Sequence, residues 1–167
     1  MNDTRVDYRV RVPHGVHFIG QTVTDEVRLN GLRGNAEGYS IAGDVTITDV
    51  RGGVIDAASI SGDISFDRID ADRVYAGTLS GDVIFGGVIR RSGEYSLLTH
   101  TGTIIVTLAP AAGVSLAVAA PRDHVRSALA LTNTSRGRRR YAGRQGDGSA
   151  RMDLTTLNGE IRIRTAE

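Results

Sequence analysis

Ser59-Ile-Ser-Gly-Asp-Ile-Ser-Phe66 is the stretch that decides the fold, because this eight-residue phrase recurs along the chain. The other copies begin at Thr22, Ser40, Thr78, Thr99 and Thr156. Successive starts are separated by 18, 19, 19, 21 and 57 residues, and the last gap is three times 19. A period near 19 that resumes after a long interruption indicates one stacked structural unit.

Apolar and polar residues alternate in the second half of each phrase; Val45 and Ile47, for example, are apolar with a polar residue between them. Alternation with period 2 is typical of a strand with one buried face. Turn residues such as Arg51-Gly52-Gly53 follow, and a second short strand such as Val54–Ser59 leads into the next phrase. Coils of this length bury a core only when they stack, about 4.8 Å apart. We therefore predict an all-β, single-stranded parallel β-solenoid with coils of about 19 residues, each of two or three strands, and right-handed because parallel crossovers are.

We expect one domain over residues 1–167, with strands also outside the phrases. Tyr8–Pro13 alternates and predicts a first strand, and Ala150–Leu154 predicts a strand before the final phrase. Residues 121–149 lose the pattern and are rich in Arg and Gly, which predicts an irregular insertion exposed as a long loop. Residues 161–167 close the chain, so we expect them to form an unpaired edge at one end of the stack.

Composition limits the chemistry that the chain can perform. Aromatic residues are 5% of the chain and Trp is absent, which favours a core of aliphatic layers. The absence of Cys excludes a disulfide scaffold, a thiol nucleophile and Cys-ligated zinc. All 20 basic residues are Arg, which excludes a Schiff-base or P-loop lysine.

Targeting signals are missing as well. No apolar run approaches the ~20 residues of a membrane span, and Met1–Tyr8 has no signal-peptide core. From this sequence we expect a cytoplasmic protein, or a surface or secreted one if a leader has been removed.

The centre of the phrase predicts a tight corner. Glycine is expected there because it adopts positive φ without strain; the corner glycines are Gly43, Gly62, Gly81, Gly102 and Gly159. The Ser or Thr that opens each phrase is expected to stack into a hydroxyl ladder beside that corner. Carboxylates follow the glycine at Asp44, Asp63 and Asp82. Such a column caps backbone amides, holds Ca²⁺, or serves acid–base chemistry on a polysaccharide, and structural capping is the interpretation we favour.

His100 occupies the second position of its phrase, where the other phrases carry aliphatic residues. We assign this column to the core; its apolar members are Ile41, Ile60, Leu79 and Leu157. A buried imidazole at this place needs a partner, either the Thr ladder or a ligand in a pocket. No catalytic, metal-binding or cofactor motif is present in the sequence. We therefore expect no enzymatic activity, no metal and no cofactor.

Five arginines lie close together in the irregular insertion: Arg136, Arg138, Arg139, Arg140 and Arg144. With the neighbouring Tyr141, they form a candidate site for an anion or a partner, such as phosphate, anionic lipid or wall polymer. The alternative is a solvated loop that balances an acidic body. Nucleic acid is not favoured, because no supporting basic positions lie elsewhere.

Several motifs in joint order resemble a known family. They are Val10-Arg-Val-Pro13-His-Gly15, the successive Ser-Gly-Asp corners, Gly93-Glu-Tyr-Ser-Leu97 leading into Thr101-Gly-Thr-Ile-Ile-Val-Thr-Leu108, Gly146-Asp-Gly-Ser-Ala-Arg-Met-Asp-Leu154, and Asn158-Gly-Glu-Ile-Arg-Ile163. In these the chain resembles the bacterial adhesin-like β-strand repeat proteins catalogued as the DUF4097 family. The resemblance covers nearly the whole chain and implies a β-solenoid without known catalytic residues.

The function that we expect is a non-enzymatic binding or scaffold module. A rigid solenoid would present a flat polar face to an unknown protein or surface polymer, and its exposed end strands would pair with another copy. The first alternative is a polysaccharide-binding or polysaccharide-cleaving β-helix. The second alternative is an anion-binding protein that uses the Arg136–Arg144 segment.

Overall fold

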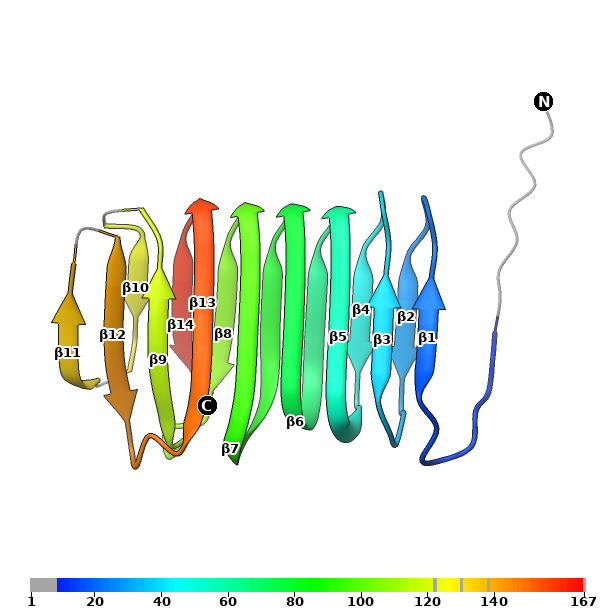
Figure 1. Cartoon of the computed structure of the whole chain (residues 1–167), viewed down its shortest axis with the longest axis horizontal. Helices are drawn as coiled ribbons and strands as arrows, with labels where there is room; N and C mark the ends of the chain where they lie inside the picture. The colour runs from blue at the N-terminus through cyan, green and yellow to red at the C-terminus, as the bar shows by residue number, and fades with distance from the viewer. Residues whose placement is uncertain (1–8, 122, 130, 138, 167) are drawn as a thin grey trace.

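Strands make up the regular structure of the chain (Figure 1). The structure is a computed structural model and describes residues 9–121, 123–129, 131–137 and 139–166. Within these residues there is no helix, which agrees with the all-β prediction. The strands are β1 (Phe18–Gln21), β2 (Val27–Asn30), β3 (Ala36–Tyr39), β4 (Val45–Thr48), β5 (Arg51–Ser61), β6 (Ile64–Ser80), β7 (Val83–Thr101), β8 (Ile104–Leu108), β9 (Val114–Ala119), β10 (Val125–Ser127), β11 (Thr132–Arg136), β12 (Arg140–Gln145), β13 (Ala150–Asn158) and β14 (Ile161–Thr165).

The strands form one mixed sheet that bends into two rows. The front row is β1, β3, β5, the second halves of β6 and β7, β13, β9, β12 and β11. The back row is β2, β4, the first halves of β6 and β7, β8, β14 and β10. Parallel partners lie one sequence period apart: Ala36 pairs with Ile55, Ile55 with Val74, and Val74 with Tyr95.

The inward residues of both rows build one aliphatic core. Val45, Ile64, Val83, Ile104 and Ile161 are aligned along the back row and fully buried. The few aromatic residues of the core contact one another edge to face. The ring centroids of Phe66 and Phe85 are 6.2 Å apart, and those of Phe85 and Tyr95 are 5.6 Å apart. Such pairs add about 0.5–1.5 kcal/mol beyond the area they bury.

The C-terminal strands lie inside the stack and not at its end. β13 pairs with β7 on one side and with β9 on the other, although β9 precedes it in the chain. β14 likewise lies between β8 and β10. The expectation that residues 161–167 form an open edge is therefore wrong for the described part, residues 161–166. The last two strands of the chain lie between two parts of the chain that precede them in the sequence.

The irregular insertion and the parallel pairing also differ from expectation. Residues 121–149 contain β10, β11 and β12 and not one long loop. β12 runs antiparallel to both β9 and β11, so the sheet is not purely parallel. The hairpin between β11 and β12 is closed by the amide of Gly137, which donates to the carbonyl of Arg140 at 2.7 Å.

The expected first strand is also absent from residues 9–13, and Tyr8 lies outside the described residues. Pairing with the neighbouring strand begins only after Pro13. The amide of Gly15 donates to the carbonyl of Arg33, and that of Phe18 donates to the carbonyl of Asn35. Val10 is 64% exposed.

Within the part of the chain that the structure describes, no helix has the length and apolar character to cross a membrane.

Candidate functional site

The hydroxyl that opens each phrase after the first is buried at the corner between the two rows. Thr78, Thr99 and Thr156 are at most 3% exposed. Their hydroxyls do not bond to one another; each donates to the carbonyl of the glycine in the phrase before. Thr99 donates to Gly81 at 2.9 Å, and Thr156 donates to Gly102 at 3.2 Å. In the five phrases after the first, the column therefore links neighbouring strands through its hydroxyls.

The aspartate column that follows the glycines caps the backbone. Asp44 accepts from the amide of Asp63, Asp63 accepts from the amide of Asp82, and Asp82 accepts from the amide of Thr103, at 2.7–2.8 Å. One carboxylate oxygen of each is thus bonded to the next strand. Among the described residues, no group of three or more His, Asp or Glu side chains is placed to hold a metal ion.

The corner glycines are required chiefly by space. A Cβ at any of the five would lie 1.8–2.3 Å from a backbone carbonyl oxygen in the phrase before. The positive φ that the sequence suggested occurs at Gly81 and Gly102, with values of +155° and +148°. Close approach of two backbones, more than a left-handed conformation, explains the residue type.

The second column of the phrase is exposed, so its assignment to the core is wrong. Ile41, Ile60, Leu79 and Leu157 are 48–54% exposed, and Val23 in the first phrase is 61% exposed. His100 is exposed as well and lines neither of the two hollows described below. The strands bury the hydroxyl at the preceding position, and side chains alternate, so the second column faces solvent.

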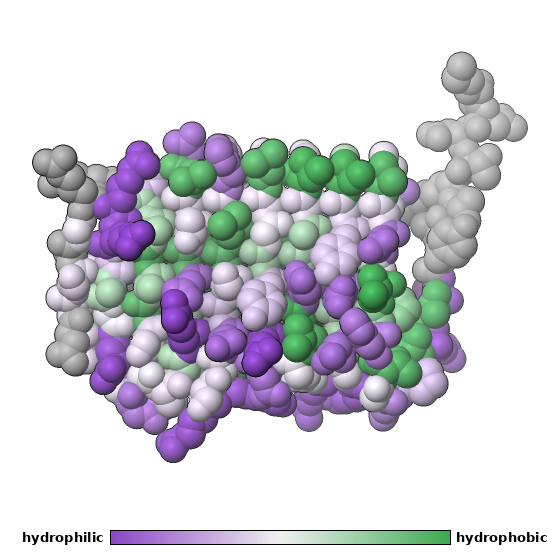
Figure 2. Space-filling view, viewed as in Figure 1, coloured by the Kyte–Doolittle hydropathy of each residue, from purple (hydrophilic) through white to green (hydrophobic). Residues whose placement is uncertain are grey.

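Two uncharged columns flank this exposed one. The residues after it are Thr24, Ala42, Ser61, Ser80, Thr101 and Asn158. The outward residues two positions before it are Gln21, Tyr39, Ala58, Gly77, Leu98 and Thr155, and register aligns them across the front row. We call these three columns the corner strip. It contains no Asp, Glu or Arg, in a chain that is 23% charged. Figure 2 shows its aliphatic side chains as a line along the upper edge.

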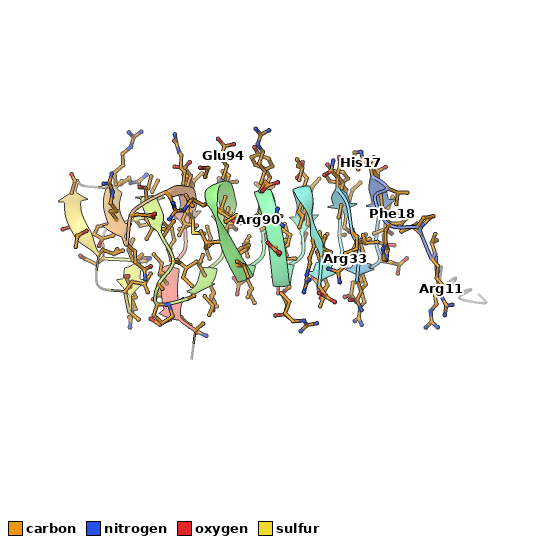
Figure 3. All side chains as sticks on the ribbon, turned by 90° about the horizontal axis from the view of Figure 1, so that it is seen from below. Arg11, His17, Phe18, Arg33, Arg90 and Glu94 are labelled. Carbon is orange, nitrogen blue, oxygen red and sulfur yellow. The ribbon has the colours of Figure 1, made fainter. Side chains whose placement is uncertain are left out.

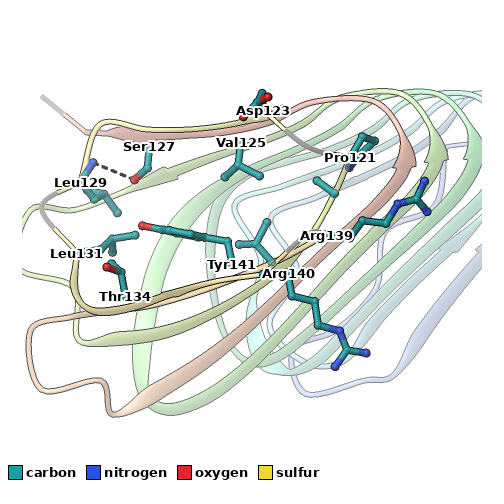
Figure 4. Close-up of a pocket in the computed structure, with 13 residues that line it drawn as sticks. Pro121, Asp123, Val125, Ser127, Leu129, Leu131, Thr134, Arg139, Arg140 and Tyr141 are labelled. Carbon is teal, nitrogen blue, oxygen red and sulfur yellow. Dashed lines mark hydrogen bonds between the residues drawn. The ribbon is translucent and has the colours of Figure 1, made fainter.

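The first two phrases enclose a shallow hollow on the corner strip. Its volume is about 390 Å³, and its lining includes Val23, Tyr39 and Ile41. A second hollow, of about 780 Å³, lies between β12 and β10 at the far end of the stack. Figure 4 shows the ring of Tyr141 across this second hollow, with Val125 and Ser127 on one side. The guanidinium groups of Arg139 and Arg140 point away from that ring.

The arginine segment is therefore part of a hairpin and not a single loop. Arg139, Arg140 and Arg144 are exposed, and the last two project from the same side of β12. Only the backbone of Arg136 is described, at the end of β11, and Arg138 lies outside the described residues. Among the described residues, neither Arg139 nor Arg140 has an acidic side chain within ion-pair distance.

A pair of carboxylates on the front row was not found from the sequence. Glu37 and Asp56 are register partners on β3 and β5. Tyr39 donates to Glu37 at 2.7 Å, and this hydrogen bond is the main reason that the pKa of Glu37 is lowered. Burial raises the pKa of Asp56, with a further contribution from the charge of Glu37. These residues lie outside the phrases, each before a corner, so only their register brings them together.

The lower corner carries a charged cluster. Arg90 contacts Asp70 through Nε at 2.5 Å and Asp72 through Nη1 at 3.0 Å. The hydrogen bond from Arg90 lowers the pKa of Asp70, and burial opposes this effect. Figure 3, which views the molecule from below, places Arg33 and Arg90 at this corner and Glu94 and His17 on the front row.

No protein-family model, no curated protein and no solved structure matches the chain. The resemblance to the DUF4097 family therefore stays a prediction.

The corner strip was not predicted from the sequence, because its apolar residues were assigned to the core. The phase of alternation, continued from Val74 and Ala76 to Thr78, is the signal that could have placed Leu79 outside.

Proposed function

We propose that the chain is a single-stranded parallel β-solenoid that acts as a non-enzymatic binding module. The sequence-period register of the parallel strands and the contribution of each phrase to both rows support the architecture. The antiparallel hairpin of β11 and β12 extends the front row at one end of the stack, where β11 pairs with β12 alone among the described residues. Each turn of chain is one coil, and the columns of the phrase run along the solenoid axis.

The observation that carries the binding role is the corner strip. It places one exposed side chain per coil in a straight line, and five of its six central residues are aliphatic. Proteins rarely leave contiguous apolar surface exposed unless a partner covers it. Depletion of charged residues is also the compositional sign of an interface core. A rigid stack of coils holds these side chains in place, so little ordering is needed on binding.

Site-specific photo-crosslinking in the cells that produce the protein tests this proposal. A photoreactive residue at Ile60, on the corner strip, should give a discrete adduct. The same residue at Ile84, which is 40% exposed on the back row, should give none. In a lysate of these cells, added wild-type protein should compete for the Ile60 adduct, and the variant Ile41→Ser/Ile60→Ser/Leu79→Ser should not. Equal adducts at the two positions, or none at either, would refute the proposal.

End-to-end self-association is a second candidate function, supported by the open strands at the N-terminal end. β1 and β2 each pair with one neighbour only, β3 and β4 respectively. Unpaired strand edges invite pairing with another copy. Sedimentation velocity over a ~100-fold concentration range should show growth that persists at high salt, since backbone pairing is weakly screened. A monomer at every concentration would eliminate this candidate.

An anion-binding role for the Arg136–Arg144 segment stays a prediction. The exposure of Arg139, Arg140 and Arg144 supports it. Binding of an anionic polymer should then weaken steeply with salt and disappear in Arg139→Ala/Arg140→Ala/Arg144→Ala.

Polysaccharide binding is supported by the front-row pair Glu37 and Asp56 beside Tyr39. A polysaccharide-binding role predicts that Tyr39→Ala abolishes retention on a polysaccharide column.

A further inference from the structure

The central part of the corner strip has an apolar line at its middle. Ile41, Ile60 and Leu79 come from three successive phrases and are 49%, 52% and 54% exposed. Small residues lie beside them at Ala42, Ser61 and Ser80, so a partner can approach the backbone closely on that side. Side chains on the strip therefore offer apolar contact without a competing charge.

Both borders of this central part are acidic. Asp44, Asp63 and Asp82 follow the corner on the back side. Glu37 and Asp56 lie on the front row, two positions before the outermost column of the strip. Among the described residues, none of these five carboxylates forms an ion pair with an arginine, although Glu37 contacts Nε2 of His17 at 2.6 Å. By contrast, Glu26 and Glu160 at the two ends of the same border are paired with arginines.

The acidic residues on both borders indicate which kind of partner can bind the corner strip. A second copy packed through the same strip would bring two acidic borders together, and like charges across an interface are unfavourable. An anionic membrane would be repelled for the same reason. A partner that carries basic residues on both sides of an apolar line matches the surface.

The distance between successive apolar residues of the line indicates the secondary structure of that partner. Neighbouring strands lie about 4.8 Å apart, so Ile41, Ile60 and Leu79 are expected at that interval. An α-helix along the solenoid axis presents one position per turn, about 5.4 Å. An extended strand presents a side chain on one side only about every 6.7 Å. Over three residues the helix stays close to register and the strand does not.

We propose that the corner strip binds a basic amphipathic α-helix of a partner protein. The helix lies along the solenoid axis, with its apolar stripe on Ile41, Ile60 and Leu79. Its Lys or Arg residues face Asp44, Asp63 and Asp82 on one border and Glu37 and Asp56 on the other. This inference rests on the binding role proposed above and specifies the chemistry of the partner.

Synthetic peptides provide the test. The probe is an 18-residue helical peptide with Leu at positions i, i+3, i+4 and i+7 and Lys on both flanks; the control peptide has Glu in place of Lys. Fluorescence anisotropy should show binding of the Lys peptide and not of the Glu peptide. Raising NaCl from about 50 to about 300 mM should weaken binding at least about fivefold.

Two variants locate the site. Ile41→Ser/Ile60→Ser/Leu79→Ser should weaken binding of the Lys peptide at least about tenfold, because a few central apolar contacts dominate such interfaces. The natural His100 in the same column shows that a polar residue is tolerated there. Val10→Ser/Ile84→Ser/Val88→Ser removes three exposed aliphatic residues outside the strip and should leave binding unchanged. Asp44→Asn/Asp63→Asn/Asp82→Asn keeps the acceptor oxygens, removes the charge and should reduce the salt dependence.

The outcomes separate this inference from the binding role itself. Equal binding of the Lys and Glu peptides, or equal effects of the two Ser variants, would overturn the inference. Adducts at Ile60 with no binding of the Lys peptide would refute the basic helix and leave the binding role standing. Binding of the wild type to zwitterionic phosphatidylcholine vesicles, or self-association that grows with salt, would also overturn it in favour of a lipid surface or a second copy.

Discussion

Asp63 accepts a hydrogen bond at 2.8 Å from the backbone amide of Asp82, the residue at the same place in the next phrase. Asp63 in turn donates its own amide to Asp44, so each aspartate is linked to the phrases before and after it. Charge-assisted bonds from a carboxylate to a backbone amide are stronger than neutral ones. The column therefore holds the strands together at the corner next to the exposed strip.

Removing one carboxylate from this column should destabilise the protein. We expect Asp63→Ala to lower the free energy of unfolding by about 1–2 kcal/mol, because the amide of Asp82 loses its acceptor. Asp63→Asn keeps an acceptor oxygen and should lose less than half as much. Urea unfolding at pH 7 measures both variants. Equal losses in the two would mean that the charge, and not the hydrogen bond, is what stabilises.

The corner glycines should be far less tolerant than a glycine of the corner strip. A Cβ at Gly102 would lie 2.0 Å from the carbonyl oxygen of Gly81, whereas a Cβ at Gly77 meets nothing within 4 Å. We expect Gly102→Ala to destabilise by at least about 3 kcal/mol or to prevent folding, and Gly77→Ala to change stability by less than about 1 kcal/mol. Thermal unfolding followed by circular dichroism compares them. Similar melting temperatures would contradict the close approach of the two backbones.

The inserted position of β13 predicts an effect on both of its neighbours. Leu154 is fully buried on β13, and Leu157, three residues later, is 48% exposed. Leu154→Ala should lower the free energy of unfolding by about 2–4 kcal/mol and speed amide exchange in β9 as well as in β7. Leu157→Ala should change stability by less than about 0.5 kcal/mol. Faster exchange in β7 alone would indicate that β9 does not depend on β13.

The ion pair of Asp70 and Arg90 predicts a pH dependence. The hydrogen bond from Arg90 holds the pKa of Asp70 below the value of about 3.9 expected in the unfolded chain. The stabilisation is therefore fully present above about pH 4 and is lost as the pH falls through the folded pKa. Because both side chains are about one-third exposed, we expect only about 0.5–1 kcal/mol.

The matching measurement is urea unfolding of wild type and Asp70→Asn between pH 7 and pH 2.5. Asp70→Asn should be less stable at pH 7, and the difference should shrink below pH 4. Asp25→Asn serves as the control, since Asp25 forms no ion pair among the described residues. A difference that does not change with pH would show that the Asp70–Arg90 charge pair is not its source.

Prediction from the sequence succeeded for the all-β class and failed for the side of the corner that faces solvent. The phrase places polar Ser or Thr next to Ile or Leu, and a hydrophobicity rule alone puts the aliphatic residue inside. In the structure Thr78 is buried and Leu79 is exposed. Burial of the hydroxyl is tolerated because it donates to the carbonyl of Gly62 at 3.0 Å.

The candidate site shows the same division. The aspartate column was found from the sequence because its members share one position of the phrase. The front border of the corner strip was not found, because Glu37 and Asp56 lie outside the phrase and only strand register brings them beside it. The hairpin of β11 and β12 was missed because Arg- and Gly-rich segments carry no clear period.

The sequence by itself determined the all-β class, the period near 19 and the place of the corner glycines, because each depends on local alternation and on spacing along the chain. Only the tertiary structure decided where the last two strands pair. β13 and β14 pair with β7 and β8 on one side and with β9 and β10 on the other. Any phrase can pair with any other phrase of matching register, so the local pattern does not specify which strands become neighbours. The burial of Met152, Leu154 and Ile161 between strands on both sides specifies the neighbours of β13 and β14.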